Sequence, residues 1–194
     1  MLETEEFQID RKSTALIVID LQKGIASRET RPHSAGAVIA NSAKLAEAFR
    51  KAGMQVFLVH VTASGVDRLS PLSDEHWSAP AQMPADWSEF VDEMRPREGD
   101  IIIVKKQWGA FYGTELDLQL RRRGIKTIVL CGIATNYGVE STARFAYEYG
   151  YNQVFAEDAM SSMSEEAHNM SIRHVFPRIG KVRKTAEILQ ALLP

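Results

Sequence analysis

The sequence predicts an α/β fold of three layers (α/β/α), with a doubly wound and mostly parallel sheet of six strands. Two observations lead to this fold class. Short β-branched apolar runs recur along the chain and are nearly continuous rather than alternating, which is typical of strands buried on both faces of a parallel sheet. Segments with helical patterning separate these runs, and regular alternation of strand and helix favours helices on both faces of such a sheet.

Four apolar runs predict strands at 14–20, 55–61, 100–106 and 127–133. Weaker runs predict a fifth strand at 152–158 and a sixth at 178–182. Helices are expected at 34–52, 114–123, 136–149, 164–175 and 184–193. Thr114 and Ser164 stand where helix N-caps are expected, and the first three helices stop at Gly53, Gly124 and Gly150.

Residues 63–99 break this alternation. They hold four of the seven prolines and two of the three tryptophans. A long irregular segment after a strand is usually a lid or an insertion. Its aromatic side chains Trp77, Trp87 and Phe90 either line a pocket or fasten the loop to the domain, and the sequence leaves both alternatives open.

Composition limits the possible function classes. The chain has 194 residues, 45% of them hydrophobic, which predicts one domain over 1–194 with a sizeable core. A net charge of -2 argues against a nucleic-acid partner. The single cysteine, Cys131, excludes an internal disulfide and a zinc site built on several thiolates. No apolar run has the length of a membrane span, and no signal peptide is recognisable, so we expect a cytoplasmic protein without a membrane partner.

The candidate site follows from a topology rule. Ligands of open parallel sheets bind outside the carboxyl ends of the strands. The first strand ends at Asp20, followed by Gln22, and the third ends at Lys105. A carboxylate at the tip of a buried strand needs a partner, and Lys105 at the tip of a neighbouring strand is the expected one. The pair is either a catalytic pair or a structural ion pair.

A third element follows the fourth strand. The segment "GIATNYGVESTARFA" (132–146) runs from a strand through a tight turn into a helix. Backbone N–H groups at such a helix start can hold an oxyanion or a carboxylate. Gly138 lies in the turn, where the lack of a side chain opens space.

These segments together resemble a known family. "VIDLQ" (18–22), "VKKQWGAFYGTEL" (104–116) and "GIATNYGVESTARFAYEYGYNQVFAEDAMSS" (132–162) are similar to the signatures of the isochorismatase-like hydrolases of the cysteine hydrolase superfamily. That group includes nicotinamidases and N-carbamoylsarcosine amidase. Order and spacing match over nearly the whole chain, and the runs "QWGAFYGT" and "GVESTAR" resemble a bacterial subgroup most.

The resemblance implies roles for three positions. Asp20 corresponds to the catalytic aspartate and Lys105 to the catalytic lysine of the family. Gly138 stands where the amidases have their nucleophilic cysteine. Cys131, inside a strand, and Ser141, one helical turn further on, are poor substitutes, so covalent thioester chemistry is not expected. The isochorismatases themselves also have glycine there, and the resemblance implies an aspartate that moves protons while water attacks.

Other positions depart from known members. Isochorismatases have a glutamine after the second strand and an arginine two residues after the lysine, whereas this chain has "VTASGV" (61–66) and Gln107. The resemblance therefore supports the mechanism class better than the substrate. Nicotinamidases hold a metal with an aspartate and two histidines after the second strand. Only His60 lies there, so neither a metal nor another cofactor is expected. A lone His76 in the loop is also a weak ligand, and we expect His168 and His174 to contact solvent or another subunit.

The family likeness also implies how the pocket is lined. It implies a non-proline cis peptide before Ala134, which would aim the N–H groups of Ala134 and Gly138 into the site. We expect substrate contacts from Gln22, Trp108, Phe111, Ala134 and Tyr137. Trp108, Phe111 and Tyr112 are either pocket walls, subunit contacts or ordinary packing. Relatives are commonly dimers or tetramers, so a homo-oligomer is expected.

Three functional hypotheses remain open. The first is a hydrolase of a small carboxylate- or amide-bearing metabolite that forms no covalent intermediate, with Asp20 as general acid or base and Lys105 beside it. The second is a catalytically impaired small-molecule-binding protein on the same scaffold. The third is an amidase that uses an activated water. Release of pyruvate or ammonia, and its sensitivity to thiol alkylation, distinguishes them.

Overall fold

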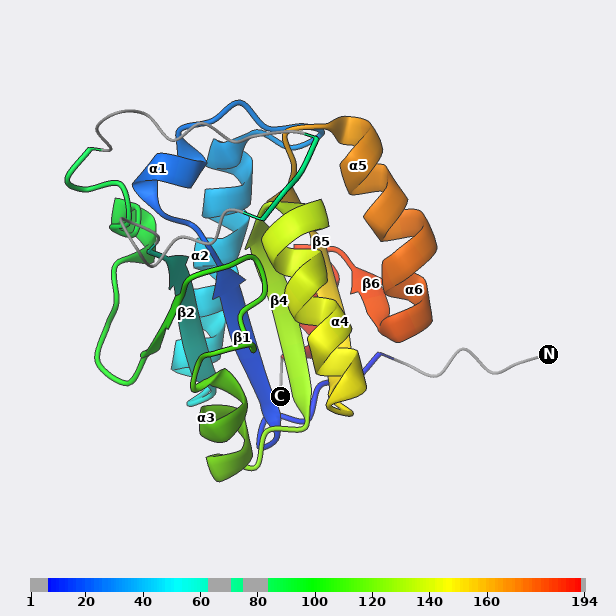
Figure 1. Ribbon diagram of the computed structural model, residues 1–194. Coiled ribbons are helices and arrows are strands. Elements are labelled where there is room, and N and C mark those ends of the chain that lie inside the picture. The colour runs from blue at the N-terminus through cyan, green and yellow to red at the C-terminus, as the bar shows by residue number, and fades with distance from the viewer. Residues whose placement is uncertain (1–6, 63–70, 75–83, 193–194) are drawn as a thin grey trace.

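The computed structural model describes residues 7–62, 71–74 and 84–192. Its centre is a six-stranded sheet in which every neighbouring pair is parallel, with the strand order β3-β2-β1-β4-β5-β6 (Figure 1). Helices cover both faces of this sheet. The predicted three-layer, doubly wound fold is confirmed, and the sheet is wholly rather than mostly parallel.

Five of the six strands coincide with predicted apolar runs, and the sixth overlaps its run only in part. The strands are β1 (Thr14–Ile19), β2 (Gln55–Val61), β3 (Ile101–Lys105), β4 (Thr127–Ile133), β5 (Asn152–Ser161) and β6 (Lys181–Arg183). β5 is longer than its apolar run, because its pairing with β4 resumes after an irregularity and continues to Ser161. β6 lies slightly later than predicted and is short.

The helices are α1 (Lys23–Ala26), α2 (Ala35–Lys51), α3 (Leu116–Arg122), α4 (Glu140–Glu148), α5 (Glu165–Met170), α6 (Phe176–Ile179) and α7 (Thr185–Ala191), with a short 3-10 helix η2 (Asp92–Met94). Two predicted helices begin or end in π-helical turns, η3 (Thr135–Val139) and η4 (Ser171–Val175). Ser164 caps α5 as predicted, with its hydroxyl accepting from Ala167 N at 3.2 Å. Thr114 is not the N-cap of α3, which is Glu115.

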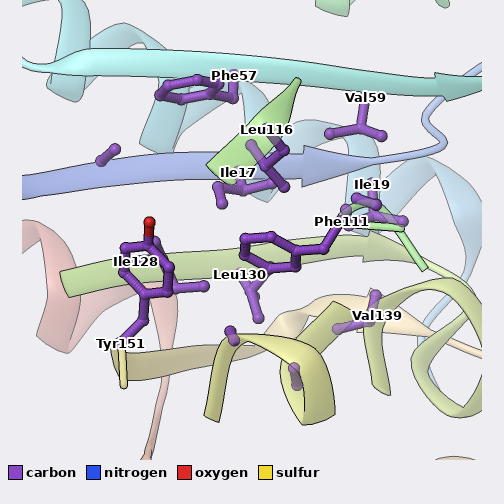
Figure 2. Close-up of a cluster of buried hydrophobic side chains, with 14 of the residues drawn as sticks. Ile17, Ile19, Phe57, Val59, Phe111, Leu116, Ile128, Leu130, Val139 and Tyr151 are labelled. Atoms are coloured by element: carbon purple, nitrogen blue, oxygen red, sulfur yellow. The ribbon is translucent and has the colours of Figure 1, made fainter. Parts of the chain in front are cut away.

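Alternating side chains of β1 feed two separate hydrophobic layers. Ala15, Ile17 and Ile19 pack under α3, α4 and α6, whereas Leu16 and Val18 pack under α2 and α7. Figure 2 shows the first layer, in which Ile17 and Ile19 lie among side chains from β2, β4 and the helical side. Both layers are buried, which explains why β1 reads as a continuous apolar run.

This topology locates the site. β1 continues to β2 on one side, whereas β4 lies on its other side, so the strand order reverses between β1 and β4. Ligands of doubly wound sheets bind at the carboxyl ends of the strands at that reversal. The carboxyl ends point to the top of Figure 1, where β1 leads into α1 and β4 leads into η3.

The segment 84–99 is fastened to the carboxyl ends of β1 and β2. Trp87 O accepts from Gly24 N at 3.0 Å, and Phe90 forms an isolated bridge with Gln22. The Phe90 ring also packs on His60 and lines a depression of about 290 Å³. Trp87 therefore fastens the loop, and Phe90 both fastens the loop and lines the depression. Trp77 and His76 lie outside the described residues. Within the described chain, no helix is both long and apolar enough to span a bilayer.

Candidate active site

Asp20 lies directly after β1 and is almost fully buried, at 3% exposure. Its backbone N–H donates to Val59 O at 2.9 Å, which ties the end of β1 to β2. Asp20 has φ +52°, the only positive φ of a non-glycine among the described residues. A left-handed backbone is unfavourable for most side chains, although aspartate tolerates it better than most, and such residues cluster at functional sites.

Lys105, the last residue of β3, is equally buried, at 2% exposure. Its Nζ donates to Asp20 Oδ2 at 2.7 Å and to the carbonyls of Gln107 and Trp108 at 3.0 and 2.9 Å. The predicted pair therefore exists. The two strands were expected to be neighbours, but β2 lies between β3 and β1. The long lysine side chain spans that distance.

Burial dominates the electrostatics of this pair. Desolvation raises the pKa of Asp20 to about 6, and the neighbouring Lys105 ammonium only partly opposes it. A lysine beside an aspartate would by itself favour the carboxylate and disfavour proton donation. With a pKa near neutrality, Asp20 can both accept and donate a proton, as general acid–base catalysis requires.

The two oxygens of Asp20 differ in their surroundings. Oδ2 is held by Lys105, whereas Oδ1 is buried and has no hydrogen-bond partner in the described part of the chain. A buried carboxylate oxygen without a donor is costly. Such an atom needs an explanation, and a water or a substrate proton at Oδ1 would supply one.

The third element also lies where the sequence placed it. The Ile133–Ala134 peptide is cis, as the resemblance implied, and η3 follows directly. Gly132 has φ +120°, and a Cβ there would lie 2.0 Å from Ile19 O, so only glycine lets β4 come this close to β1.

Gly138 brings η3 against Asp20 more tightly than expected. A Cβ added at Gly138 would lie 2.9 Å from Ile19 Cγ2 and 3.1 Å from Asp20 Oδ2. The expectation that glycine opens space for water at this point is therefore wrong. The missing side chain lets η3 pack directly on the carboxylate, and Gly138 belongs to the site through this close approach.

Two predicted substrate-binding residues have structural roles instead. The fully buried Gln22 uses its amide on backbone groups, donating to Val61 O and Trp87 O and accepting from Val61 N. Phe111 is buried in the first core layer (Figure 2), and its ring contacts those of Tyr149 and Tyr151. Gln22 was predicted from its position after the first strand and Phe111 from the family likeness, and the structure places Phe111 in ordinary packing, one of the alternatives left open for it.

The remaining predicted contacts stay compatible with a site lining. Trp108 is 62% exposed, and its ring lies 4.8 Å from that of Tyr137, which is also exposed. Trp108 O accepts from Lys105 Nζ, so this aromatic pair adjoins the ion pair. Ala134 is nearly buried. Tyr112 is exposed, and its carbonyl accepts a hydrogen bond from the Gln107 side-chain amide at 2.5 Å. The Gln107 amide therefore stabilises the loop that contains both residues.

The structure confirms that Cys131 is a poor nucleophile and corrects the prediction for His168. Cys131 is buried in β4, where desolvation raises the pKa of its thiol to about 12, so it is an inert packing residue. His174 is exposed as expected. His168 does not contact solvent, because its side chain is fully buried against Thr135 and Glu157.

Sequence reasoning missed the surroundings of His168. The residues His33 and Glu157 join it from two other segments, and Thr135 links it to η3. The run "AED" at 156–158 was the one available signal, since it places acidic residues inside an apolar strand.

Comparisons with known proteins identify the family. Residues 14–187 match the model of the isochorismatase domain. The chain is 53% identical to the isochorismatase family protein YwoC of Bacillus subtilis, over 94% of this chain and 95% of that protein. It is 34% identical to the ureidoacrylate amidohydrolase RutB of Caulobacter segnis, over 94% and 87%.

Solved structures give the same result. An isochorismatase family protein from Burkholderia thailandensis superposes with a TM-score of 0.90 and 43% identity, over 95% of this chain and 97% of that one. N-carbamoylsarcosine amidase from Thermoplasma acidophilum follows with a TM-score of 0.75 and 28% identity, over 89% and 96%. With this match over nearly its whole length, the chain belongs to the isochorismatase family of hydrolases.

Proposed function

We propose that this hydrolase cleaves a small carboxylate- or amide-bearing metabolite without a covalent intermediate. Asp20 transfers the proton, Lys105 fixes the carboxyl group, and water is the nucleophile. The observation that carries the proposal is that the two oxygens of the Asp20 carboxyl group have different surroundings. Oδ2 is occupied by Lys105 at 2.7 Å, and Oδ1 is buried without a partner among the described residues.

The proton balance follows from this arrangement. The oxygen of a water molecule forms the bond to the electrophilic carbon of the substrate. With an amide, one proton of that water passes to Asp20 Oδ1, and the leaving nitrogen takes it up as its bond to carbon breaks. With a vinyl ether, protonated Asp20 first gives its proton to the terminal vinyl carbon, and water then attacks the oxocarbenium carbon and returns a proton to Asp20. The leaving oxygen takes up that proton as its bond to carbon breaks, while the hydroxyl of the hemiketal returns a proton to Asp20 and the ketone of pyruvate forms. A pKa of about 6 suits both transfers, because neither protonation state of Asp20 is strongly disfavoured near neutral pH.

The absence of an accessible thiol supports a water-based route. Gly138 replaces the cysteine of the amidase relatives, and the single cysteine of the chain is buried in β4. In the first turn of η3, Tyr137 N–H donates to Ala134 O at 3.2 Å, whereas the N–H groups of Thr135 and Asn136 have no carbonyl one turn earlier to bond to. They support the binding of a carboxylate or the stabilisation of an oxyanion beside Asp20.

The names of the relatives indicate which substrates to test first. RutB is a ureidoacrylate amidohydrolase and the Thermoplasma protein is an N-carbamoylsarcosine amidase, so both are named for amide hydrolysis. Amides and ureido acids are the first class, and vinyl ethers are the second, because the glycine at 138 resembles the isochorismatases.

The experiment is a screen of the purified protein against both classes, with ammonia and pyruvate as the measured products. We expect multiple turnovers that iodoacetamide does not suppress, and the Cys131→Ala variant is the matched control for adventitious thiol chemistry. Loss of turnover on alkylation of the wild type but not of Cys131→Ala would contradict the water-based route. Binding of a small carboxylate with no product from either class would favour the catalytically impaired alternative.

A further inference from the structure

A second cluster of ionisable side chains lies outside the Asp20 site. His33 comes from the segment before α2, Glu157 from β5 and His168 from α5. His33 Nε2 lies 3.0 Å from Glu157 Oε1, and His168 Nε2 lies 3.5 Å from the same oxygen. The two imidazole rings stand nearly perpendicular, at 84°, with their centroids 5.6 Å apart.

This spacing is that of metal ligands. A tetrahedral zinc ion binds histidine nitrogen and carboxylate oxygen at about 2.0–2.1 Å, which places neighbouring ligand atoms about 3.3 Å apart. The two distances to Glu157 Oε1 fall within about 0.3 Å of that value, and all three ligand atoms lie within 4.8 Å of one another. Binding of an ion would bring the two imidazole nitrogens, which lie within 4.8 Å of each other, to about 3.3 Å.

His168 supplies an independent observation. Its side chain is buried, and its Nε2 makes no hydrogen bond within the described residues. Its other ring nitrogen, Nδ1, is bonded to Thr135 Oγ1 at 2.8 Å. A ligating histidine normally uses its second nitrogen in this way, on a partner that fixes the orientation of the ring.

Glu157 has the charge that a cation requires. The nearby imidazole of His168 and the hydrogen bonds from Lys184 and His33 hold the pKa of Glu157 well below its usual range, although burial opposes them. Lys184 contacts Oε2, whereas both imidazoles face Oε1. The lysine side chain is 56% exposed and can move away, which would reduce its repulsion of a bound cation.

We propose that His33, Glu157 and His168 form a binding site for a divalent transition-metal ion, with zinc as the first candidate. Two imidazoles and one carboxylate are a ligand set for zinc and its neighbours rather than for calcium or magnesium. His33 and Glu157 are partly exposed, so an ion has access and water can complete the coordination. No metal was expected from the sequence, because His168 was predicted to contact solvent or another subunit, whereas the structure buries it in this cluster.

The site would act on η3 through Thr135. Thr135 is the first residue of η3, the turn that carries Gly138 against Asp20. An ion on His168 Nε2 fixes that ring, and the ring fixes the Thr135 hydroxyl. The ion therefore stabilises the position of the turn and takes no part in bond cleavage.

The test measures metal binding directly. Protein freed of metal by chelation is dialysed against Zn²⁺ and analysed for bound metal, and Co²⁺ serves as the spectroscopic probe. We expect one ion per chain and the intense visible absorption of four-coordinate Co²⁺. His33→Ala and Glu157→Gln should each weaken binding by about 10–100-fold or more. His174→Ala, which removes an exposed histidine in η4, is the matched control and should bind like the wild type.

A second measurement guards against variants that fail to fold. The melting temperature of the wild type and of His174→Ala should rise with added Zn²⁺, whereas that of folded His33→Ala should not. Failure of the wild type to bind Zn²⁺ at micromolar concentration would overturn the proposal. Binding that His33→Ala and Glu157→Gln leave unchanged would overturn it equally, since the ion would then lie elsewhere. Neither result depends on the activity of the Asp20 site.

Discussion

Replacing Asp20 with asparagine tests whether burial or the lysine sets the protonation of this carboxyl group. Asparagine keeps the size of the side chain and tolerates φ +52°. It also leaves Lys105 its two carbonyl acceptors, Gln107 O and Trp108 O. The variant therefore removes one ionisation with little change in shape.

The size of the effect follows from the pKa of Asp20. The folded-state value of about 6 exceeds the unfolded value of about 3.9, so the folded protein binds this proton more tightly. Stability from this group is complete below about pH 4 and is lost as the pH rises through 6. Between pH 4.5 and 7.5 the wild type should lose about 2 kcal/mol relative to Asp20→Asn.

The assay is urea unfolding of both proteins at several pH values between 4.5 and 7.5. The quantity of interest is the difference in unfolding free energy between wild type and variant at each pH, because pH effects common to both proteins cancel. If Lys105 dominated instead, the folded-state pKa would lie below the unfolded value of about 3.9, and the wild type would gain stability relative to the variant below about pH 4, so the difference would change little between pH 4.5 and 7.5. A flat or rising difference would therefore refute the claim that burial wins.

Three further results are expected. The pH dependence of kcat/KM should show one ionisation near pH 6, whose direction tells whether Asp20 acts first as acid or as base, and a profile flat from pH 5 to 8 would exclude it. Cys131→Ala should keep wild-type turnover within about twofold while losing about 1–2 kcal/mol of stability, measured by urea unfolding, since the thiol only fills the core. Gly138→Cys should lower kcat by at least about tenfold rather than create a thiol enzyme. The reason is that its Cβ would lie 2.9 Å from Ile19 Cγ2 and push against Asp20. Unchanged or increased turnover would show that the turn tolerates a side chain.

Most of the fold was predictable because its strands are buried on both faces. Continuous apolar runs marked five strands well, and glycine marked the ends of three helices. The π-helical turns η3 and η4 were not predictable, because a π-turn keeps the same apolar pattern as an α-helix over so few residues. β6 is three residues long, too short for any period to define its bounds.

The site was predictable where backbone position decides it. Asp20 and Lys105 meet because parallel strands bring their carboxyl ends to one edge. The rule does not say which way a side chain turns, so Gln22 was expected to contact substrate although its amide bonds the backbone. For Phe111 the sequence left pocket wall and ordinary packing open, and the structure shows packing. The cluster of His33, Glu157 and His168 was missed because long-range packing joins residues that no motif connects.

Two expectations stay predictions. The structure contains one chain, so the homo-oligomer is untested, and the identity of the small-molecule substrate is likewise open to the screen described above. The hydrolase class is supported by the family match over residues 14–187 and by relatives that are named for amide hydrolysis.

The central claim is that Asp20 carries proton transfer without a thiol. The most direct test compares kcat/KM of wild type, Asp20→Asn and Asp100→Asn on a substrate found in the screen. Asp100 is the matched control, since it is a buried carboxylate paired with Arg50 at 2.7 Å. It precedes β3 and so lies at the amino ends of the strands, away from Asp20 at their carboxyl ends. Asp20→Asn should lose about 10²–10⁴-fold in kcat/KM while Asp100→Asn stays within about tenfold of the wild type. Wild-type turnover in Asp20→Asn would contradict the account.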